Sequence, residues 1–158
     1  MPTTDQHVDE RTRATTAGPA ALWRVVEGIG GERGWYSATP AWQARGLLDR
    51  AVGGEGMRRG RRDPDRLRVG DPVDFWRVEA VEPGRSLRLR AEMRMPGTAR
   101  LEFHVEQDRD GGAVLRQRVT FAPRGPLGSA YWWASTVVGH GLVFRAMVRD
   151  ITRAAERG

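Results

Sequence analysis

The stretch from Leu87 to Met95 alternates strictly between apolar and charged side chains, and this alternation constrains the fold more than any other feature. Successive side chains of a β-strand point to opposite faces, so one face of this strand is apolar and the other is charged. Residues 74–81, 101–106 and 113–121 repeat the pattern, with turn-forming Pro and Gly between them. The spacing predicts four consecutive strands of an antiparallel meander, whose apolar face must be covered by helices.

Weaker patterns on either side of the meander predict the remaining elements. Residues 11–16 alternate loosely and indicate a first strand, and the Gly18-Pro19 pair then opens a helical segment. A second helix is expected over residues 40–52, and the remainder of the chain after the meander, to Arg157, is expected to be one long helix.

Together these elements predict an α+β, helix-grip fold, in which a curved antiparallel sheet wraps a long C-terminal helix and two short helices follow the first strand. The 158 residues are the length of one domain. We expect residues 1–10 to form a flexible tail and residues 11–158 to form that domain.

The composition excludes several kinds of chemistry. All 26 basic residues are arginine, so there is no lysine for a Schiff base or a P-loop, and there is no cysteine for thiol chemistry. The three histidines, His7, His104 and His140, are too scattered to suggest a metal site, and His104 falls on the charged face of its strand. The glycines between Gly28 and Gly34 do not match a dinucleotide fingerprint. We therefore expect neither a metal nor a cofactor.

Two segments bear on location. The N-terminus is polar and does not resemble a secretory signal, which favours a cytoplasmic protein. The run from Leu127 to Phe144 lacks formal charge but contains polar residues and three glycines. We interpret it as part of a buried amphipathic helix, and do not expect a membrane partner.

Two motifs carry a resemblance to a known family. The segment TTAGPAALWRVVEGIGG resembles the opening strand and helix of START-like domains, the superfamily of polyketide cyclases and pollen allergens. The block GGEGMRRGRRDPDRLRVGDPVDFWRVE is similar to a domain of unknown function in that superfamily, often fused behind a short-chain-dehydrogenase-like NAD(P)-binding domain. The likeness covers residues 12–155. It implies a helix-grip fold and suggests a dehydrogenase-like partner protein, but it implies no particular reaction.

An arginine cluster lies between the second helix and the meander. It could cradle phosphate or nucleic acid, but nearby aspartates favour a solvated basic loop, and no aromatic residues are interleaved with it to stack on bases. We therefore do not expect nucleic acid, although Arg58 or Arg59 could clamp an acidic group of a small ligand. The cluster comprises Arg58, Arg59, Arg61, Arg62, Arg66 and Arg68, with Asp63, Asp65 and Asp71 nearby.

Two polar residues, Asp74 and Gln117, fall on the inward face of the predicted strands by alternation. A buried carboxylate needs a partner, so Asp74 is expected either to form an ion pair, for instance with Arg58 or Arg59, or to act as a general acid or base positioned by Gln117. The pairing is the favoured alternative. His140 is either a satisfied core residue or a titrating group in a pocket.

The predicted function is to bind a small hydrophobic or aromatic molecule in an apolar cavity beneath the C-terminal helix. A cofactor-free acid–base enzyme of the cyclase, dehydratase or isomerase type, acting on a polyketide-like substrate, would use Asp74 or His140 to move the proton. The alternatives are a non-catalytic ligand carrier, or an interaction module or homodimer that uses whichever of Trp132 and Trp133 faces outward. The expected ligand contacts are Trp35, Tyr36, Trp42, Arg59, Trp76, Met93, Phe103, Gln117, Tyr131 and Phe144.

Overall fold

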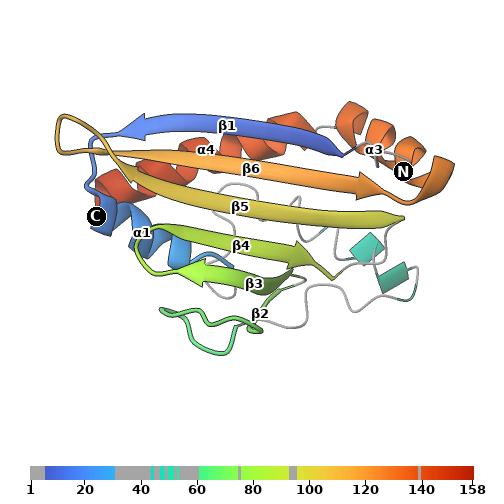
Figure 1. Ribbon diagram of the computed structural model, residues 1–158, viewed down its shortest axis with the longest axis horizontal. Coiled ribbons are helices and arrows are strands. Elements are labelled where there is room, and N and C mark those ends of the chain that lie inside the picture. Colours follow the sequence, from blue (N-terminus) through green and yellow to red (C-terminus); the bar gives the residue numbers. More distant parts are fainter. Residues whose placement is uncertain are drawn as a thin grey trace.

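The computed structural model describes the backbone of residues 6–30, 44, 47, 48, 50, 51, 53, 61–74, 76–92, 96–138 and 140–158, and the side chains of these residues except 135–138 and 140. One six-stranded antiparallel sheet dominates these ranges (Figure 1). The strands stand in the order β1-β6-β5-β4-β3-β2, so the first strand lies beside the last. Their bounds are β1 His7–Thr15, β2 Pro72–Val73, β3 Trp76–Glu82, β4 Ser86–Ala91, β5 Gly97–Gln107 and β6 Ala113–Pro123.

The four predicted strands of the meander appear as β3 to β6, with the expected alternation of burial. Leu101, Phe103 and Val105 are buried on β5, whereas Glu102 and His104 face the other side. The two-residue strand β2 was not predicted, because an element this short shows no periodicity.

The first strand is longer than predicted. β1 begins at His7, four residues before the expected start, and the added residues pair with β6 from His7 opposite Phe121 to Glu10 opposite Arg118. The prediction that residues 1–10 form a flexible tail is therefore wrong for residues 7–10. The strand forms because β6 supplies hydrogen-bonding partners that no local pattern reveals.

The helix that follows β1 confirms the prediction from the Gly18-Pro19 pair. α1 spans Pro19–Glu27, and the carbonyl of Gly18 accepts a 3.1 Å hydrogen bond from the Leu22 amide. Pro19 is tolerated at this position because the first amides of a helix have no partner within it. Most of the second predicted helix, residues 40–52, lies outside the described residues.

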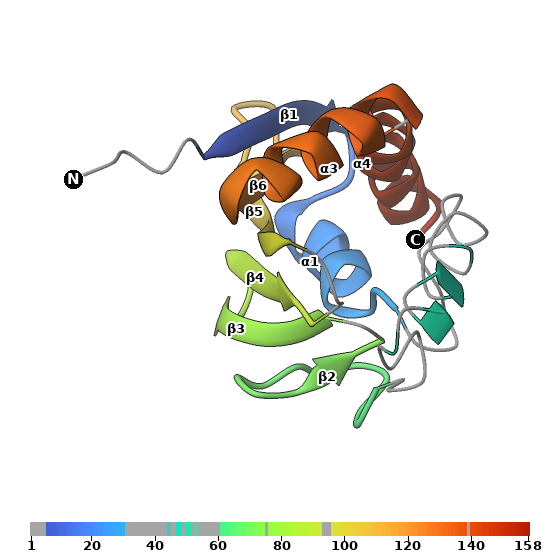
Figure 2. The ribbon, with the colours of Figure 1, turned by 90° about the vertical axis from the view of Figure 1, so that its right-hand side faces the viewer.

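The C-terminal segment is helical, as predicted, on both sides of residue 139, which lies outside the described residues. α3 spans Gly125–Val138 and packs on β6, whereas α4 spans His140–Arg157 and packs on β1 and α1 (Figures 1 and 2). A Cβ on Gly128 would lie 2.4 Å from the carbonyl oxygen of Pro96, so only glycine lets the first turn of α3 come this close to the start of β5. Residues 127–144 carry no formal charge, so their pattern does not reveal that α3 and α4 pack on different elements.

The core lies between the concave face of the sheet and the helices α1 and α4, around which the sheet curves (Figure 2). The helix α4 contributes residues at helical spacing, which gives it one continuous apolar stripe. No helix in the described part of the chain is both long and apolar enough to cross a membrane. The buried stripe of α4 comprises Phe144, Met147, Val148, Ile151 and Ala155.

Candidate functional site

Three side chains form a row across neighbouring strands on the concave face of the sheet. Arg11 of β1 pairs with Gln117 of β6, and Gln117 pairs with Phe103 of β5. Directly paired residues of antiparallel strands project to the same face, with Cβ atoms about 5 Å apart. Gln117 is 1% exposed, and its Nε2 donates a 3.0 Å hydrogen bond to the carbonyl oxygen of Phe144 in the first turns of α4. The row therefore lies where the sheet meets α4.

In the described part of the chain, three buried polar atoms without hydrogen-bond partners lie on this part of the concave face, and another, Arg118 Nε, lies on the convex face. Within the described residues, Gln117 Oε1, Arg11 Nε and His7 Nε2 are all buried and all lack a partner. Arg11 uses Nη2 to donate to Asp9 Oδ2 at 3.3 Å. A buried polar atom without a partner costs about 1–3 kcal/mol, so such atoms are rare where a core serves stability alone.

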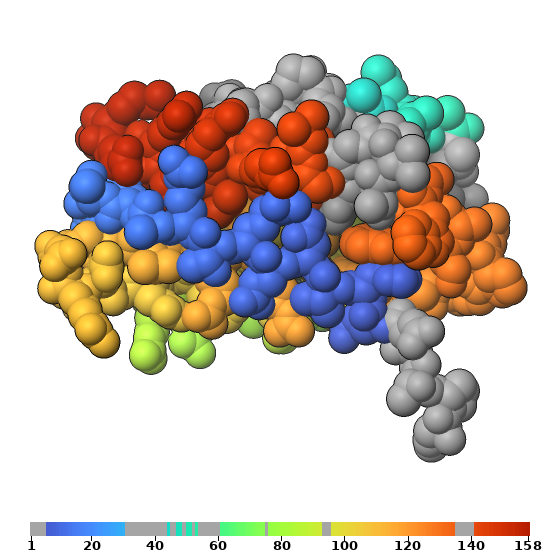
Figure 3. Space-filling model, turned by 90° about the horizontal axis from the view of Figure 1, so that it is seen from above, coloured from blue at the N-terminus to red at the C-terminus, as the bar shows by residue number. Residues whose placement is uncertain are grey.

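Aromatic side chains cover the end of this face near the N-terminus. Trp132 of α3 stacks on His7, with ring centroids 4.8 Å apart, and on Phe121, at 5.7 Å. Tyr131 also contacts Phe121, at 5.7 Å. Seen from above, β1 runs alongside α4 (Figure 3).

The contribution of β1 is what the sequence analysis missed. His7, Asp9 and Arg11 face inward, while Val8 faces outward and is half exposed. The hydrophobic pattern is thus inverted, and a period-two signal in hydrophobicity assigns such a strand to the wrong face or to a tail. Because nearly all residues of β1 are polar, its sequence does not reveal which of its two faces is buried.

Gln117, Phe103 and Phe144 were predicted ligand contacts, and the structure brings these three together. Gln117 faces inward as alternation predicts. Within the described residues its hydrogen bond goes to Phe144 and not to Asp74, so a role in positioning Asp74 stays a prediction. Tyr131 lies further along the same face, beside Phe121.

Asp74 and Trp76 lie at the other end of the sheet, on or next to β3. Asp74 is 4% exposed, as predicted, but it does not belong to a strand: it is the first residue of the two-residue connection between Val73 and Trp76. Its φ of 55° falls in the left-handed region, which aspartate enters more readily than most residues. The prediction of burial assumed that Asp74 is a strand residue. Asp74 is buried, but as a residue of the turn between β2 and β3.

The remaining predicted site residues fall outside the described part. His140 is the first residue of α4, and its side chain is not among those described. Nothing in the structure therefore bears on the expected catalytic role of His140 or on part of the expected aromatic lining. The predicted contacts outside the description are Trp35, Tyr36, Trp42, Arg59 and Met93.

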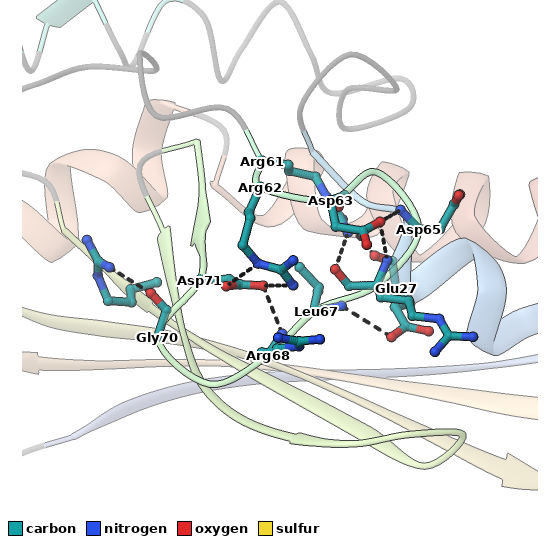
Figure 4. Close-up of polar contacts among 11 residues, drawn as sticks. Glu27, Arg61, Arg62, Asp63, Asp65, Leu67, Arg68, Gly70 and Asp71 are labelled. Atoms are coloured by element: carbon teal, nitrogen blue, oxygen red, sulfur yellow. Dashed lines mark hydrogen bonds and ion pairs between the residues drawn. The ribbon is translucent and has the colours of Figure 1, made fainter.

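Two described arginines of the cluster before β2, Arg61 and Arg62, make contacts that hold the fold together (Figure 4). Arg61 Nη1 donates to the carbonyl oxygens of Glu27 and Ile29, at 2.6 and 2.7 Å, and so caps the C-terminal end of α1. Arg62 makes a bidentate contact with Asp71. These contacts favour the interpretation of the cluster as a structural loop whose aspartates offset its charge.

Glu27 links α1 to the same loop. Its carboxylate accepts hydrogen bonds from the Trp23 indole, at 2.8 Å, and from the Leu67 amide, at 3.3 Å (Figure 4). The side chain of Glu27 and its carbonyl thus both receive donors, which holds the loop from Arg61 to Leu67 on the end of the helix.

On the convex face of the sheet, arginines pair with glutamates across strands. Arg100 Nε and Arg88 Nε each lie 2.9 Å from the same oxygen of Glu79, and these guanidinium groups hold the pKa of the Glu79 carboxyl below its usual range. Arg116 similarly lies 3.2 Å from Glu106. The charged half of the alternating pattern therefore forms a paired, mixed-sign surface.

The curved sheet, the helix α1 and the C-terminal helix packed across the concave face define a START-like, helix-grip domain. The chain belongs to the family described as Protein of unknown function (DUF2867), whose model matches residues 2–147. No curated protein matches the chain.

Solved structures with the same fold share little sequence with this chain. Norcoclaurine synthase from Thalictrum flavum has a TM-score of 0.59 at 12% identity, over 97% of this chain and 95% of that one. The ZhuI aromatase/cyclase from Streptomyces sp. R1128 has a TM-score of 0.58 at 16% identity, over 96% and 94% of the two chains. Ara h 8.0201 has a TM-score of 0.51 at 12% identity, over 97% and 99%. At these identities the likeness establishes the fold alone.

Proposed function

We propose that this domain binds a small hydrophobic or aromatic molecule between the concave face of the sheet and α4. The observation that carries the proposal is the set of buried, unpartnered polar atoms at His7, Arg11 and Gln117 on the face that packs against α4. A core built for stability avoids such atoms, whereas a ligand site needs a few polar groups that fix the orientation of its occupant. The fold shared with an aromatase/cyclase and a norcoclaurine synthase supports this proposal.

In this proposal the ligand contacts Phe103, Gln117 and Phe144, which lie together, and Tyr131 at the aromatic end of the site. A ligand that carries few charges fits this face, because Asp9 and Arg11 beside Gln117 pair with each other. The polar N-terminal segment favours a cytoplasmic location.

Native mass spectrometry of gently purified protein tests the binding proposal directly. We expect an added mass of a small molecule, which extraction and mass fragmentation would then identify. Protein that carries no small molecule and binds none from a panel of hydrophobic aromatic compounds would contradict the proposal. Co-purifying nucleic acid would instead support a binding role for the arginine cluster.

Within this proposal the domain is either a cofactor-free acid–base enzyme or a carrier. For the enzyme, the candidate acid or base among the described residues is the buried carboxylate of Asp74. Asp74→Asn and His140→Ala separate the alternatives once a ligand is identified. An enzyme loses turnover with either substitution, whereas a carrier changes little in affinity.

A second candidate function is that of an interaction module. Trp133 is 66% exposed and Leu127 is 72% exposed on α3, which supports a contact with a second copy or with a dehydrogenase-like protein. Analytical ultracentrifugation of the wild type and of Trp133→Ser checks the first alternative. A dimer that dissociates in the variant supports the contact, and a monomeric wild type contradicts self-association.

A further inference from the structure

We propose that the ligand presents a hydroxyl group, phenolic or enolic, which binds between Arg11 and Gln117. This inference rests on the proposed ligand-binding function and names the chemical group that the site recognises. It follows from two buried atoms of opposite hydrogen-bonding character on directly paired residues.

The two atoms belong to neighbours on the concave face. Arg11 and Gln117 are register partners on β1 and β6, so their side chains leave the sheet side by side. The guanidinium Nε of Arg11 is a donor, the amide Oε1 of Gln117 is an acceptor, and both are buried without a partner in the described part of the chain.

The orientation of the Gln117 amide follows from its other contact. Its Nε2 donates to the carbonyl oxygen of Phe144 at 3.0 Å. Turning the amide over would place Oε1 against that carbonyl, and two acceptors would then face each other. Gln117 therefore presents an acceptor, not a donor, to anything that binds beside it.

A hydroxyl group satisfies both atoms at once. Its oxygen accepts the N–H of Arg11 Nε, and its O–H donates to Gln117 Oε1. A carboxylate would satisfy Arg11 but would face Gln117 acceptor to acceptor. The positive charge of Arg11 is also already offset by Asp9, 3.3 Å from Nη2, so the site has less need of a full negative charge.

The neighbouring residues favour an aromatic carrier of that hydroxyl. Gln117 on β6 has Arg11 of β1 on one side and Phe103 of β5 on the other. Phe103 can pack against an aromatic ring whose hydroxyl points towards β1. Gly141 leaves room for the guanidinium at the start of α4, because a Cβ there would lie 3.3 Å from Arg11 Nη2. A phenol or an enolised aromatic ketone combines the apolar ring and the hydroxyl that these residues would recognise.

The test compares three probes of similar shape by isothermal titration calorimetry at neutral pH: naphthalene, 2-naphthol and 2-naphthoate. We expect the wild-type protein to bind 2-naphthol about tenfold or more tightly than naphthalene, and also more tightly than 2-naphthoate. Arg11→Met and Gln117→Met should each abolish the preference for 2-naphthol, so that the ratio of its affinity to that of naphthalene falls from about ten to about one.

Two controls keep this test decisive. Arg13→Met removes an exposed arginine two residues along the same strand and should leave all three affinities unchanged. Because Gln117→Met also removes the contact with Phe144, Arg11→Met provides the independent variant, and thermal melting verifies that both are folded.

The outcomes separate this inference from the proposed function. Equal affinities for naphthalene and 2-naphthol mean that water alone satisfies Arg11 and Gln117, which overturns the hydroxyl inference and leaves the binding function standing. Tightest binding of 2-naphthoate also overturns it, in favour of an acidic ligand. If none of the three probes binds while native mass spectrometry shows a bound small molecule, the hydroxyl inference is overturned and the binding function stands. If no small molecule is bound either, the proposed function fails as well.

Discussion

The guanidinium of Arg62 and the carboxylate of Asp71 face each other through two parallel hydrogen bonds, Nε to Oδ1 at 3.0 Å and Nη2 to Oδ2 at 3.1 Å. Oδ2 also accepts the Arg68 amide at 2.9 Å. The pair closes the loop before β2 and so anchors the small β2–β3 hairpin, whose turn contains Asp74.

This pair predicts a loss of stability in acid. The hydrogen bonds from Arg62, followed by the Arg68 amide, hold the pKa of the Asp71 carboxyl below its usual range, against the opposing effect of burial. As the pH falls, Asp71 therefore binds a proton at a higher pH in the unfolded chain than in the folded protein. The contribution of the pair is complete above the ordinary aspartate pKa of about 4 and is lost as the pH falls through the folded-state value.

Urea denaturation of the wild type and of Asp71→Asn between about pH 7 and about pH 3 measures this effect. The variant should be less stable at neutral pH and should lose less stability on acidification. Asp110→Asn, which changes an exposed carboxylate in the β5–β6 turn, serves as the control. Parallel pH profiles for wild type and Asp71→Asn would show that the pair contributes nothing to folding.

Arg61→Met should destabilise the protein by about 2 kcal/mol, because hydrogen bonds from a charged donor to the carbonyls of Glu27 and Ile29 are lost at the end of α1. Chemical denaturation followed by circular dichroism provides the measurement. Arg66→Met, at an exposed position in the same loop, should change the unfolding free energy by less than about 0.5 kcal/mol. Equal effects of the two substitutions would refute the capping role of Arg61.

Thr15→Val should cost about 1 kcal/mol of stability. The buried hydroxyl of Thr15 donates to Glu156 Oε1 at 2.8 Å and accepts the Ala17 amide at 3.2 Å, and so ties the end of β1 to the end of α4. Valine keeps the shape but not the hydrogen bonds. Thr12→Val, on the exposed face of the same strand, is the matched control in thermal unfolding, and a loss of similar size there would argue against the tie.

Gly112→Ala should destabilise the fold more than Gly111→Ala. A Cβ on Gly112 would lie 2.3 Å from the carbonyl oxygen of Thr15, so the β5–β6 turn and the end of β1 would have to separate, at a cost of about 2 kcal/mol or more. Gly111 faces open space but has a φ of 83°, which costs a side chain only about 1 kcal/mol. Thermal melts of both variants check the ranking, and a more stable Gly112 variant would contradict the close approach.

The two adjacent tryptophans of α3 should behave differently. Trp132→Ala removes the ring stacked on His7 and Phe121 and should cost about 2–3 kcal/mol. Trp133→Ala, at an exposed position, should change the unfolding free energy by less than about 0.5 kcal/mol in the monomer. Urea titrations followed by circular dichroism compare them, and a reversed order would mean that α3 is rotated on β6.

Local sequence patterns predicted the structure correctly where residues that are close in sequence are also close in space. The meander from β3 to β6 needs only short turns between alternating segments, and the Gly18-Pro19 pair fits the start of α1 by itself. Alternation likewise placed Gln117 inward, and adjacency on one helix required one of Trp132 and Trp133 to face outward. The resemblance to START-like domains agreed with this order of elements.

Contacts between distant segments decided the rest. β1 carries polar side chains inward, and only its pairing with β6, more than a hundred residues away, reveals that His7 and Arg11 belong to the candidate site. The packing of α3 on β6 and of α4 on β1 and α1 likewise depends on segments far away in the sequence. The physical reason is that a residue's own side chain sets its preference for strand or helix, whereas its burial depends on what the rest of the chain places opposite it.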